Sequence, residues 1–265
     1  MDIDLEKDFR LLGLRLERWF TVFVIIIVVA AWEIGVRIGE VSSLFFPAPS
    51  VILLTFVRLI ANGKLLTNAG ASFLRVFWGL ALGGGAGLIL GFVMGWSHRL
   101  YGLIDPLIAA AHPVPKIAIL PIIMILFGIG ESSKVVIVAV TTFFPMLINT
   151  IAGVRQISPI HFEVAKNYGA DITKIFTRVI LPGSLPLVLT GVRLAFNMAL
   201  LMTIAVELVA AQKGLGAMIW MAWQTLRTEG LYVSLFVTAG LGILFNFFLQ
   251  RITFHLIPWQ IEQNN

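Results

Sequence analysis

The chain has 265 residues, of which 58% are hydrophobic and 12% are charged, and its mean hydropathy is +0.95. Soluble domains carry about 25% charged residues, so this composition indicates a polytopic membrane protein. The net charge of +5 fits an excess of cytoplasmic Lys and Arg, as membrane proteins show, rather than nucleic-acid binding. The absence of cysteine excludes disulfides, thiol catalysis and cysteine metal sites, and the four scattered histidines have no metal-ligand spacing.

The N-terminal segment 1–19 mixes acidic and basic residues, unlike the short basic leader of a signal peptide. The apolar run that follows, 20–38, is long enough to cross a bilayer, which takes about 20 residues. We therefore expect a retained anchor helix. The predicted organisation is an N-terminal segment with this anchor over 1–45, and one membrane domain over 46–265.

Apolar runs give six candidate spans, at 20–38, 70–96, 106–127, 133–153, 186–211 and 229–254. The predicted fold is an all-α membrane helix bundle with both termini on one side. Lys and Arg decide that side, because they are enriched in cytoplasmic segments.

With the N-terminus inside, the cytoplasmic segments hold Lys7, Arg10, Arg15, Arg18, Arg99, Arg155, Lys166, Lys174, Arg178 and Arg251. The outer segments hold only Arg58, Lys64, Lys134, Lys213 and Arg227, and four more, Arg37, Arg75, Lys116 and Arg193, lie within or at the edge of spans. We therefore expect both termini to be cytoplasmic. Because the turn at 128–133 is very short, a re-entrant hairpin of the third and fourth runs is the alternative.

The second run carries a glycine at every fourth position: Gly79, Gly83, Gly87, Gly91 and Gly95. Four residues advance a helix by about 400°, so the glycines stay on one slowly drifting face. Such a stripe lets helix backbones approach closely in lipid. We interpret it as a helix-packing seam, with a pore-lining stripe as the alternative. A nucleotide fingerprint is excluded, because no strand precedes the glycines and no acidic ribose partner follows.

Prolines interrupt the third run at Pro113, Pro115 and Pro121, and Pro145 lies inside the fourth. Such prolines free backbone carbonyls and often help to build a translocation path, although shaping of the helices alone is an equal alternative. Polar residues within the runs are candidates for that path, because burying them in lipid is costly. They are Lys116, Thr141, Asn149, Asn197 and Glu207. Glu33 and Arg37, one helical turn apart, are expected to pair.

No motif for enzymatic chemistry occurs in the sequence. The segment from Gly128 to Lys134 resembles a phosphate-binding loop, but Ser133 stands where that loop requires glycine before its lysine. There is no Gly-x-Ser-x-Gly elbow, His-Glu-x-x-His pair or pocketed carboxylate dyad. The chain itself is therefore expected to be no enzyme and to hold no cofactor or metal.

A polar insert, 155–185, separates the fourth and fifth runs. Its helix-starting and helix-ending residues predict two short helices: Ser158-Pro159 begins the first, Gly169 ends it, and Asp171 caps the second. We expect Pro182 to end the second helix. By the Lys and Arg count this insert is cytoplasmic, where another protein could bind it.

The insert resembles the EAA coupling motif of ABC importer permeases, which reads Glu-Ala-Ala, three residues, Gly, nine residues and Ile-x-Leu-Pro. Here it reads Glu163-x-Ala165-x(3)-Gly169-x(9)-Val179-x-Leu181-Pro182, with Val164 in place of the Ala at the motif's second position and Val179 in place of Ile. Both exchanges are small and apolar. Over about 45–254 the chain is similar to the branch serving aliphatic sulfonates, taurine and nitrate, at 46–50, 105–107, 113–121, 127–131, 144–145, 190–193, 205–207 and 214–216.

The resemblance implies a type I importer-like permease subunit of a bacterial inner membrane, working as a homodimer with two ATPase subunits that bind ATP and Mg²⁺. An extracytoplasmic binding protein would deliver a small anion such as a sulfonate, taurine or nitrate. The residues implied in ATPase coupling are Phe162, Glu163, Ala165, Tyr168, Gly169, Leu181 and Pro182. Of these, Phe162, Ala165 and Tyr168 are spaced to form one apolar helix face that fits a partner's groove.

Two functions from other classes are the alternatives. An ion-gradient-driven secondary transporter would need coupling acids in mid-membrane and usually an internal repeat, and no repeat is found. A membrane scaffold that transports nothing would have no reason for proline-broken spans. Neither alternative calls for an insert that a motor protein could grip.

Overall fold

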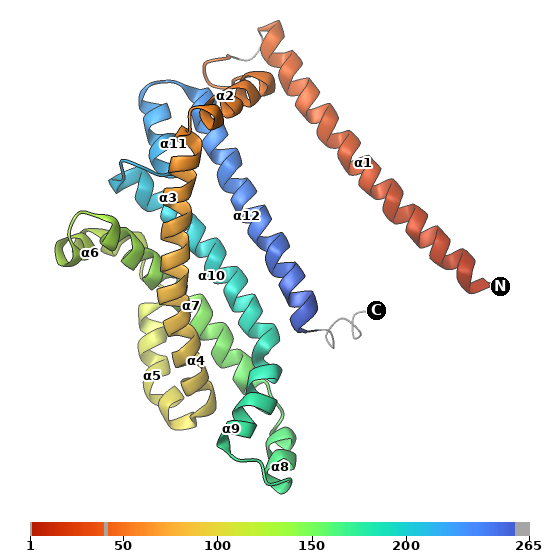
Figure 1. Cartoon of the computed structure of the whole chain (residues 1–265), viewed down its shortest axis with the longest axis vertical. Helices are drawn as coiled ribbons and strands as arrows, with labels where there is room; N and C mark the ends of the chain where they lie inside the picture. Colours follow the sequence, from red (N-terminus) through yellow and green to blue (C-terminus); the bar gives the residue numbers. More distant parts are fainter. Residues whose placement is uncertain (1, 40–41, 258–265) are drawn as a thin grey trace.

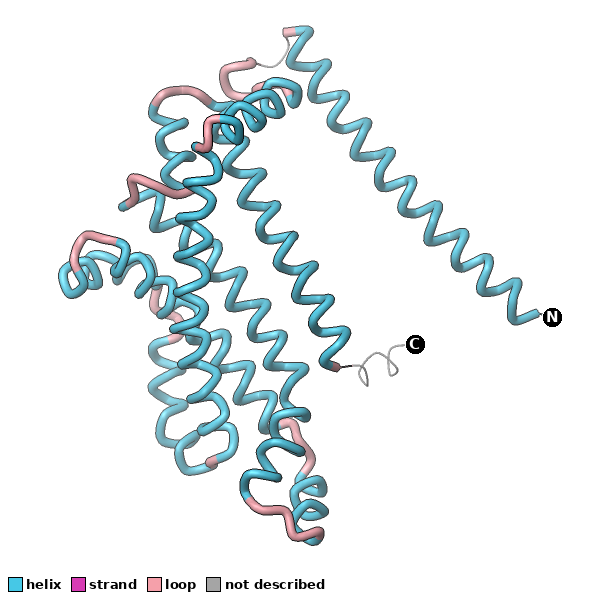
Figure 2. The backbone as a smooth tube through the Cα atoms, viewed as in Figure 1, coloured by secondary structure: helices cyan, strands magenta, loops and turns pink. Residues whose placement is uncertain are grey.

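The computed structural model describes residues 2–39 and 42–257, and every regular element within those ranges is helical (Figure 1). In chain order the elements are α1 (Asp2–Ile38), α2 (Pro49–Ala61), α3 (Lys64–Gly79), the π-helical turn η1 (Leu80–Gly84), α4 (Gly85–Trp96), α5 (His98–Ala111), the 3-10 turn η2 (Lys116–Ile119), α6 (Leu120–Phe127), α7 (Glu131–Arg155), α8 (Pro159–Asn167), α9 (Ile172–Ile175), the π-helical turn η3 (Phe176–Ile180), α10 (Leu181–Ala210), α11 (Leu215–Gln224) and α12 (Thr228–Leu256). Short loops join them (Figure 2).

Five helical segments in the described ranges are long and apolar enough to cross a membrane: Trp19–Ile38, Lys64–Trp96, Glu131–Arg155, Ile172–Ala210 and Thr228–Leu256. The third apolar run is not a straight span, because α5 and the η2–α6 segment meet at 85°. The break falls at Pro113 and Pro115, which cannot donate backbone hydrogen bonds. Counting this bent pair as one span gives six, whereas Pro145 lies inside the continuous α7.

α7 is the central helix of the bundle and packs against α10, α4, η1 and α3. The main apolar core gathers around it from α3, α6, α7 and α10: Val76, Leu120, Ile123, Ile137, Val138, Phe196, Ala199 and Val206. Lipid tails are as apolar as this core, so close packing and interhelical hydrogen bonds hold such a bundle together.

The five evenly spaced glycines of the second span face α7. A methyl group added at any of them would lie within 3 Å of α7: at Gly79 against Val138, at Gly83 against Ala139, at Gly87 against Phe143, and at Gly91 and Gly95 against Thr150 and Val154. The Thr142 hydroxyl also donates to the Gly79 carbonyl at 3.0 Å. The span and α7 can reach this separation only because these positions lack a side chain.

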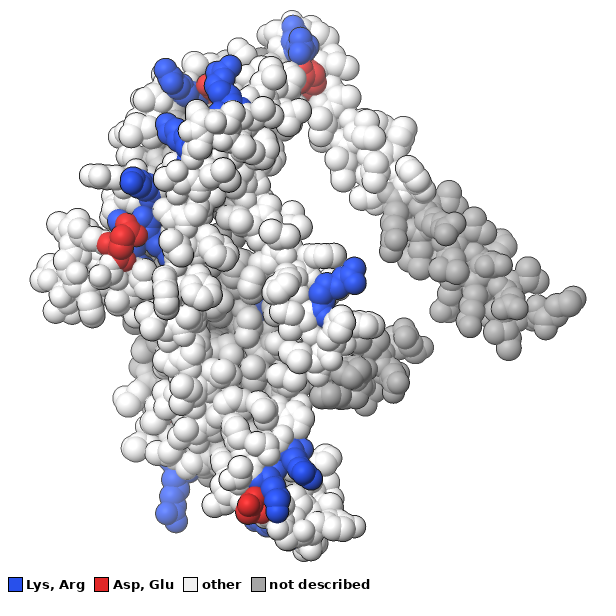
Figure 3. Space-filling model, viewed as in Figure 1, with Lys and Arg blue, Asp and Glu red and all other residues white. Residues whose placement is uncertain are grey.

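The bundle has two contrasting ends (Figure 1). At one end, α2 and α11 join the start of α3 and α12 around an apolar cluster of Ile52, Leu65, Leu215, Met218 and Val233; we name it the α2–α11 end. At the other end α8 and α9 protrude beyond the spans, and we name it the α8–α9 end. Most charged side chains visible in Figure 3 lie toward these two ends.

α1 stands apart from the other helices and leans on α2 (Figure 1). In the apolar stretch of α1, Trp19–Ile38, only 6% of the residues are buried. Glu33 joins the C-terminal end of α1 to α2. The Glu33 carboxylate accepts from the Ser50 N–H at 3.0 Å and from the Ser50 hydroxyl at 2.8 Å. Arg37 Nε lies 2.6 Å from Glu33 Oε1, which confirms the predicted ion pair.

Candidate coupling surface and buried ion-pair network

α8 has Pro159 in its first turn, as predicted, and its chain reversal is set by Gly169. The φ angle of Gly169 is +71°, a left-handed conformation that favours glycine. The N–H groups of Gly169 and Ala170 donate at 2.9 Å to the carbonyls of Lys166 and Ala165, which is a Schellman closure. A Cβ at Gly169 would meet nothing within 4 Å, so backbone conformation rather than crowding demands glycine here.

The second short helix has its predicted cap, because Asp171 Oδ1 accepts from the Lys174 N–H at 2.8 Å. The prediction that Pro182 ends this helix is wrong. α9, η3 and α10 follow one another without a loop and form one helical segment over Ile172–Ala210. Proline is compatible with the first turn of a helix, and Pro182 takes that place in α10. The short helix is therefore a rigid extension of a membrane span.

The apolar face of α8 differs from the predicted one. Phe162 and Ala165 are partly buried and pack against a cluster of the chain's own bundle, which contains Val154, Ile175 and Ile180. The exposed apolar side chains are Ile160 (54% exposed), Val164 (47%) and Tyr168 (88%).

α8 packs beside η3, so Phe162 faces the bundle rather than solvent. Glu163 is exposed beside the outward face, Leu181 is 39% exposed, and Pro182 is half-buried. Of the predicted coupling residues, Glu163, Tyr168 and Gly169 therefore lie on the free surface, whereas Phe162 and Ala165 support α8 from behind.

The residues predicted for a translocation path do not gather at one place. Lys116 donates from Nζ to the carbonyls of His112 and of Ala111, the latter at 3.5 Å, and so caps the broken end of α5. Thr141 and Asn149 each donate to a carbonyl of their own helix, α7, at 2.8 Å.

Asn197 accepts from Asn246 of α12 at 3.4 Å, and Glu207 lies in the network described next. No hydrogen bond joins any two of the five within 2–39 and 42–257. Their role in a path stays a prediction.

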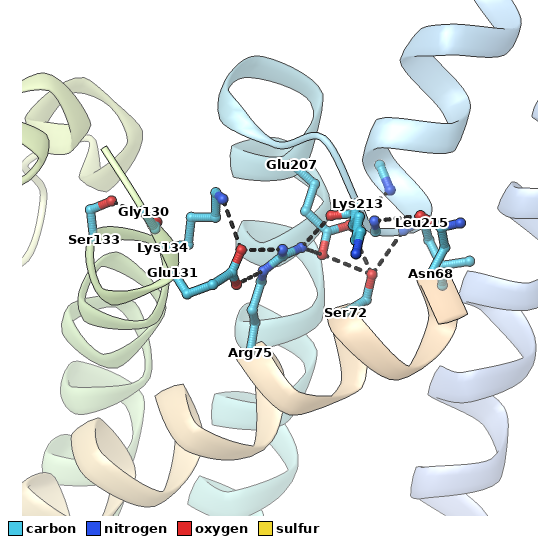
Figure 4. Close-up of polar contacts among 12 residues, drawn as sticks. Asn68, Ser72, Arg75, Gly130, Glu131, Ser133, Lys134, Glu207, Lys213 and Leu215 are labelled. Atoms are coloured by element: carbon cyan, nitrogen blue, oxygen red, sulfur yellow. Dashed lines mark hydrogen bonds and ion pairs between the residues drawn. The ribbon is translucent and has the colours of Figure 1, made fainter. Parts of the chain in front are cut away.

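An ion-pair network centres on Arg75 of α3, whose side chain is 3% exposed, and links the buried Glu207 to Glu131, whose side chain is 65% exposed (Figure 4). Its guanidinium forms a fork on Glu131 of α7, with Nε to Oε2 and Nη2 to Oε1 both at 2.7 Å. Nη1 donates to Glu207 of α10 at 2.6 Å and to the Lys213 carbonyl at 2.7 Å. Lys134 Nζ adds a further contact to Glu131 at 3.0 Å. One side chain thus joins three spanning helices.

The same network holds the loop that leads into α11. The Ser72 hydroxyl lies 2.8 Å from both Glu207 oxygens and accepts from the Leu215 N–H at 2.8 Å. The Gly216 N–H donates to Glu207 Oε2 at 2.8 Å, and the Gly214 N–H donates to Asn68 Oδ1 at 2.7 Å. Gly214 has φ +134° and no room for a Cβ beside the Glu207 carboxylate. The loop is therefore fixed to α3 and α10 by its backbone.

Sequence reasoning named Glu207 but missed its partners on α3. Asn68, Ser72 and Arg75 are spaced by four and three residues, so they form a polar stripe on one helix face. That stripe could have been recognised beside the glycine stripe of the same span. Its acid partners could not, because Glu131 and Glu207 are far away in sequence.

The network has a structural role: it joins α3, α7 and α10 to one another and to the loop before α11. Each buried charge has a partner, and no group of three metal-ligating side chains occurs in the described ranges.

A second intramembrane cation behaves differently: Arg193 of α10 is exposed, lies four residues before Asn197, and forms no ion pair in the part of the chain that the structure describes. Such a cation in a span is a functional candidate.

Five apolar helices long enough to span, a bent sixth pair and a helical protrusion beyond them are the architecture of a multi-pass membrane protein. Residues 83–261 match the family described as the binding-protein-dependent transport system inner membrane component, and the chain belongs to that family. It is an ABC importer permease subunit.

Curated relatives span most of the chain. It is 33% identical over 234 residues to the putative aliphatic sulfonates transport permease protein SsuC of Bacillus subtilis, covering 88% of this chain and 85% of that protein. It is 31% identical to the taurine transport system permease protein TauC of Escherichia coli, covering 89% and 88%. It is also 30% identical to the formylaminopyrimidine transport permease protein ThiX of Halalkalibacterium halodurans, covering 92% and 96%.

The fold matches that of a solved ABC transporter. A chain of the MetNI methionine ABC transporter in an inward-facing conformation superposes with a TM-score of 0.59 at 19% identity, covering 71% of this chain and 91% of that one. The likeness establishes the importer-type membrane fold that the sequence predicted.

Proposed function

We propose that the chain works as a homodimer with two ATPase subunits that bind ATP and Mg²⁺, and that the α8–α9 end is where they dock. The observation that carries this proposal is the outward face of Ile160, Val164 and Tyr168, held on a rigid extension of α10. An exposed apolar helix face of this kind fits a groove on a partner. Because α9, η3 and α10 are continuous, a push on the protrusion moves a spanning helix directly.

The α8–α9 end and both termini lie in the cytoplasm. Arg155, Lys166, Lys174 and Arg178 gather in this segment, and cytoplasmic loops of membrane proteins are enriched in such residues. The α2–α11 end then faces outward, where an extracytoplasmic binding protein delivers the substrate. In the same proposal, this chain hydrolyses no ATP, and the ATPase subunits do so.

The exposed α1 supports a second copy. In its apolar stretch, Trp19–Ile38, 6% of the residues are buried, and its contacts with the bundle are with α2 and, through Trp32, with Tyr232 of α12. A span that touches so little of its own bundle is available to pack against another permease copy as well as lipid. In this arrangement the two copies enclose the translocation path between them.

We place the substrate in the sulfonate class. Two relatives are named for aliphatic sulfonates and taurine, which carry a sulfonate anion. Arg193 offers an exposed cation within a span, and a guanidinium suits an oxyanion. ThiX is named for a formylaminopyrimidine, so competition of unlabelled taurine, an alkanesulfonate, nitrate and a pyrimidine against labelled taurine uptake identifies the class.

The test of function is to purify the chain with the ATPase and binding protein encoded beside its gene, and to measure vanadate-sensitive ATP hydrolysis. We expect the binding protein to stimulate hydrolysis. Gly169→Trp should insert into the membrane but release the ATPase, because its backbone requires φ near +71°. Gly102→Trp is the matched control, since a Cβ there meets nothing within 4 Å and its backbone has ordinary φ.

Full coupled hydrolysis in Gly169→Trp would contradict the docking assignment. The rival secondary transporter gives a different pattern. Its uptake would be abolished by a protonophore and unaffected by vanadate, whereas an ABC importer responds in the opposite way.

A further inference from the structure

A hollow of about 750 Å³ opens at the α2–α11 end of the bundle. Five segments far apart in sequence line it: the end of α2, the turn into α3, the loop 211–213, α11, and the start of α12. The helices that line it, α2 and α11 among them, lie at the opposite end of the molecule from α8 and α9 (Figure 1). We name it the basic hollow, for the charges described next.

Four cations line the basic hollow, namely Arg58, Lys64, Lys213 and Arg227, against one acid, Glu229. All four are exposed, and none forms an ion pair or a side-chain hydrogen bond within the described ranges. Like charges gathered in one concave surface repel each other and raise the local potential. An anionic partner would relieve that repulsion.

The position of these cations is unexpected for a membrane protein. Outer segments are depleted of Lys and Arg, and only five occur there by the predicted topology. Four of those five converge on the basic hollow, and the fifth, Lys134, is paired with Glu131. Scattered surface charges would not meet at one place from four separate segments.

The turn that presents Arg227 is held in a rarely used conformation. Leu226, directly before it, has φ +54°, the only positive φ at a non-glycine residue in the described ranges. A left-handed backbone crowds the leucine side chain, and non-glycine residues with positive φ concentrate at functional positions. Leu226 is also 53% exposed, so burial of its side chain does not explain the turn.

The charged groups are suited to a protein surface rather than to a small anion. A small-molecule site presents free polar groups at its enclosed centre. Here the cations are on the exposed rim, and the buried polar side chain of the wall, Asn68, is committed to the Gly214 N–H and the Lys64 carbonyl. Rim charges steer and orient a macromolecular partner of opposite charge.

We propose that acidic side chains on the surface of the binding protein dock in the basic hollow. This inference rests on the proposed function, because it requires the α2–α11 end to face outward. The hollow adjoins the Arg75 network: Lys213 lines the hollow, and its carbonyl accepts from Arg75 at 2.7 Å. A docked partner therefore touches the loop that Arg75 holds against three spanning helices.

The test measures binding of the neighbouring-gene binding protein to the permease–ATPase complex in phosphatidylcholine nanodiscs. We expect Arg58→Glu/Arg227→Glu to weaken binding at least ten-fold and to flatten its dependence on salt. Poly-glutamate should compete with the binding protein on the wild type but not on this variant. Arg251→Glu, an exposed charge reversal toward the other end of α12, is the control and should bind as the wild type does.

Co-purification of the ATPase with each variant shows that the permease is folded and that the proposed function stands independently. Wild-type affinity in Arg58→Glu/Arg227→Glu would overturn the proposal. Two further results would also overturn it. Competition by sulfate beyond that of chloride at equal ionic strength would assign the hollow to small anions, and an effect of the variant only with phosphatidylglycerol present would assign it to lipid headgroups.

Discussion

Replacing Gly87 by alanine tests how closely the second span packs on α7. A Cβ at Gly87 would lie 2.5 Å from the Phe143 carbonyl oxygen, 3.1 Å from the Leu147 nitrogen and 3.2 Å from Met146 Cβ. Ordinary van der Waals contact begins near 3.4 Å, so the two helices must separate by roughly 0.9 Å (3.4 less 2.5). The obstructing atoms include backbone, which cannot rotate away as a side chain can.

The cost follows from overpacking. Inserting a methyl group into a well-packed core costs about 1–3 kcal/mol, and alanine returns up to about 1 kcal/mol of helix propensity. Because the clash at Gly87 is with backbone atoms, its cost lies in the upper part of that range, about 2–3 kcal/mol, and the net loss is therefore about 1–2 kcal/mol. At about 2–4 °C per kcal/mol for a chain of this size, the thermal midpoint should fall by about 2–8 °C.

Gly85→Ala is the matched control two residues away. A Cβ at Gly85 meets no atom within 4 Å, so this variant keeps the packing and gains only propensity. Thermal unfolding of the purified complex in one detergent, followed by tryptophan fluorescence, compares the two. Equal midpoints for Gly87→Ala and the wild type would refute the close packing of α4 on α7.

Glu207→Gln removes the charge of one of the two acids that contact Arg75 and leaves Glu131 in place, so folding stability should fall by about 1.5–3 kcal/mol, while Arg37→Gln in the exposed pair should lose at most about 1 kcal/mol, which denaturation in detergent compares. Tyr168→Ala should weaken ATPase co-purification without lowering thermal stability, because its side chain is 88% exposed; an unchanged ATPase yield would count against the outward face of α8. Arg193→Ala should raise the substrate concentration for half-maximal taurine uptake more than Arg193→Lys does, and equal uptake by both variants and the wild type would remove Arg193 from the path.

Local patterns in the sequence predicted the helices well, because their physical causes are local. The glycine stripe, the first-turn proline Pro159, the cap at Asp171 and the left-handed turn at Gly169 all follow from the preferences of single residues or short spacings. The family resemblance rested on short motifs of the same kind, in the insert 155–185 and elsewhere over about 45–254. These features needed no knowledge of how distant helices meet.

Two expectations failed where tertiary contacts decide. Pro182 was expected to stop a helix, but the π-helical turn before it lets α9 run into α10. Phe162 and Ala165 were expected to share one outward apolar face with Tyr168, but both are partly buried against the chain's own bundle beside η3; their part in coupling stays a prediction.

The partners of Arg75 and the convergence of cations on the basic hollow also depend on the fold. Arg75 meets Glu131 and Glu207 across 56 and 132 residues of sequence. Spacing along one chain carries no signal of such a meeting. The polar stripe on α3 was visible in the sequence, whereas the identity of its acids was not.

The most direct test of the account is where the two ends of the bundle lie. The chain has no cysteine, so single cysteines at Tyr168 and at Arg227 can be labelled with a membrane-impermeant maleimide. In intact cells, we expect Arg227→Cys to be labelled and Tyr168→Cys to react only after the membrane is opened. Labelling of Tyr168→Cys from outside intact cells, with Arg227→Cys protected, would place the coupling helices away from any ATPase and contradict the account.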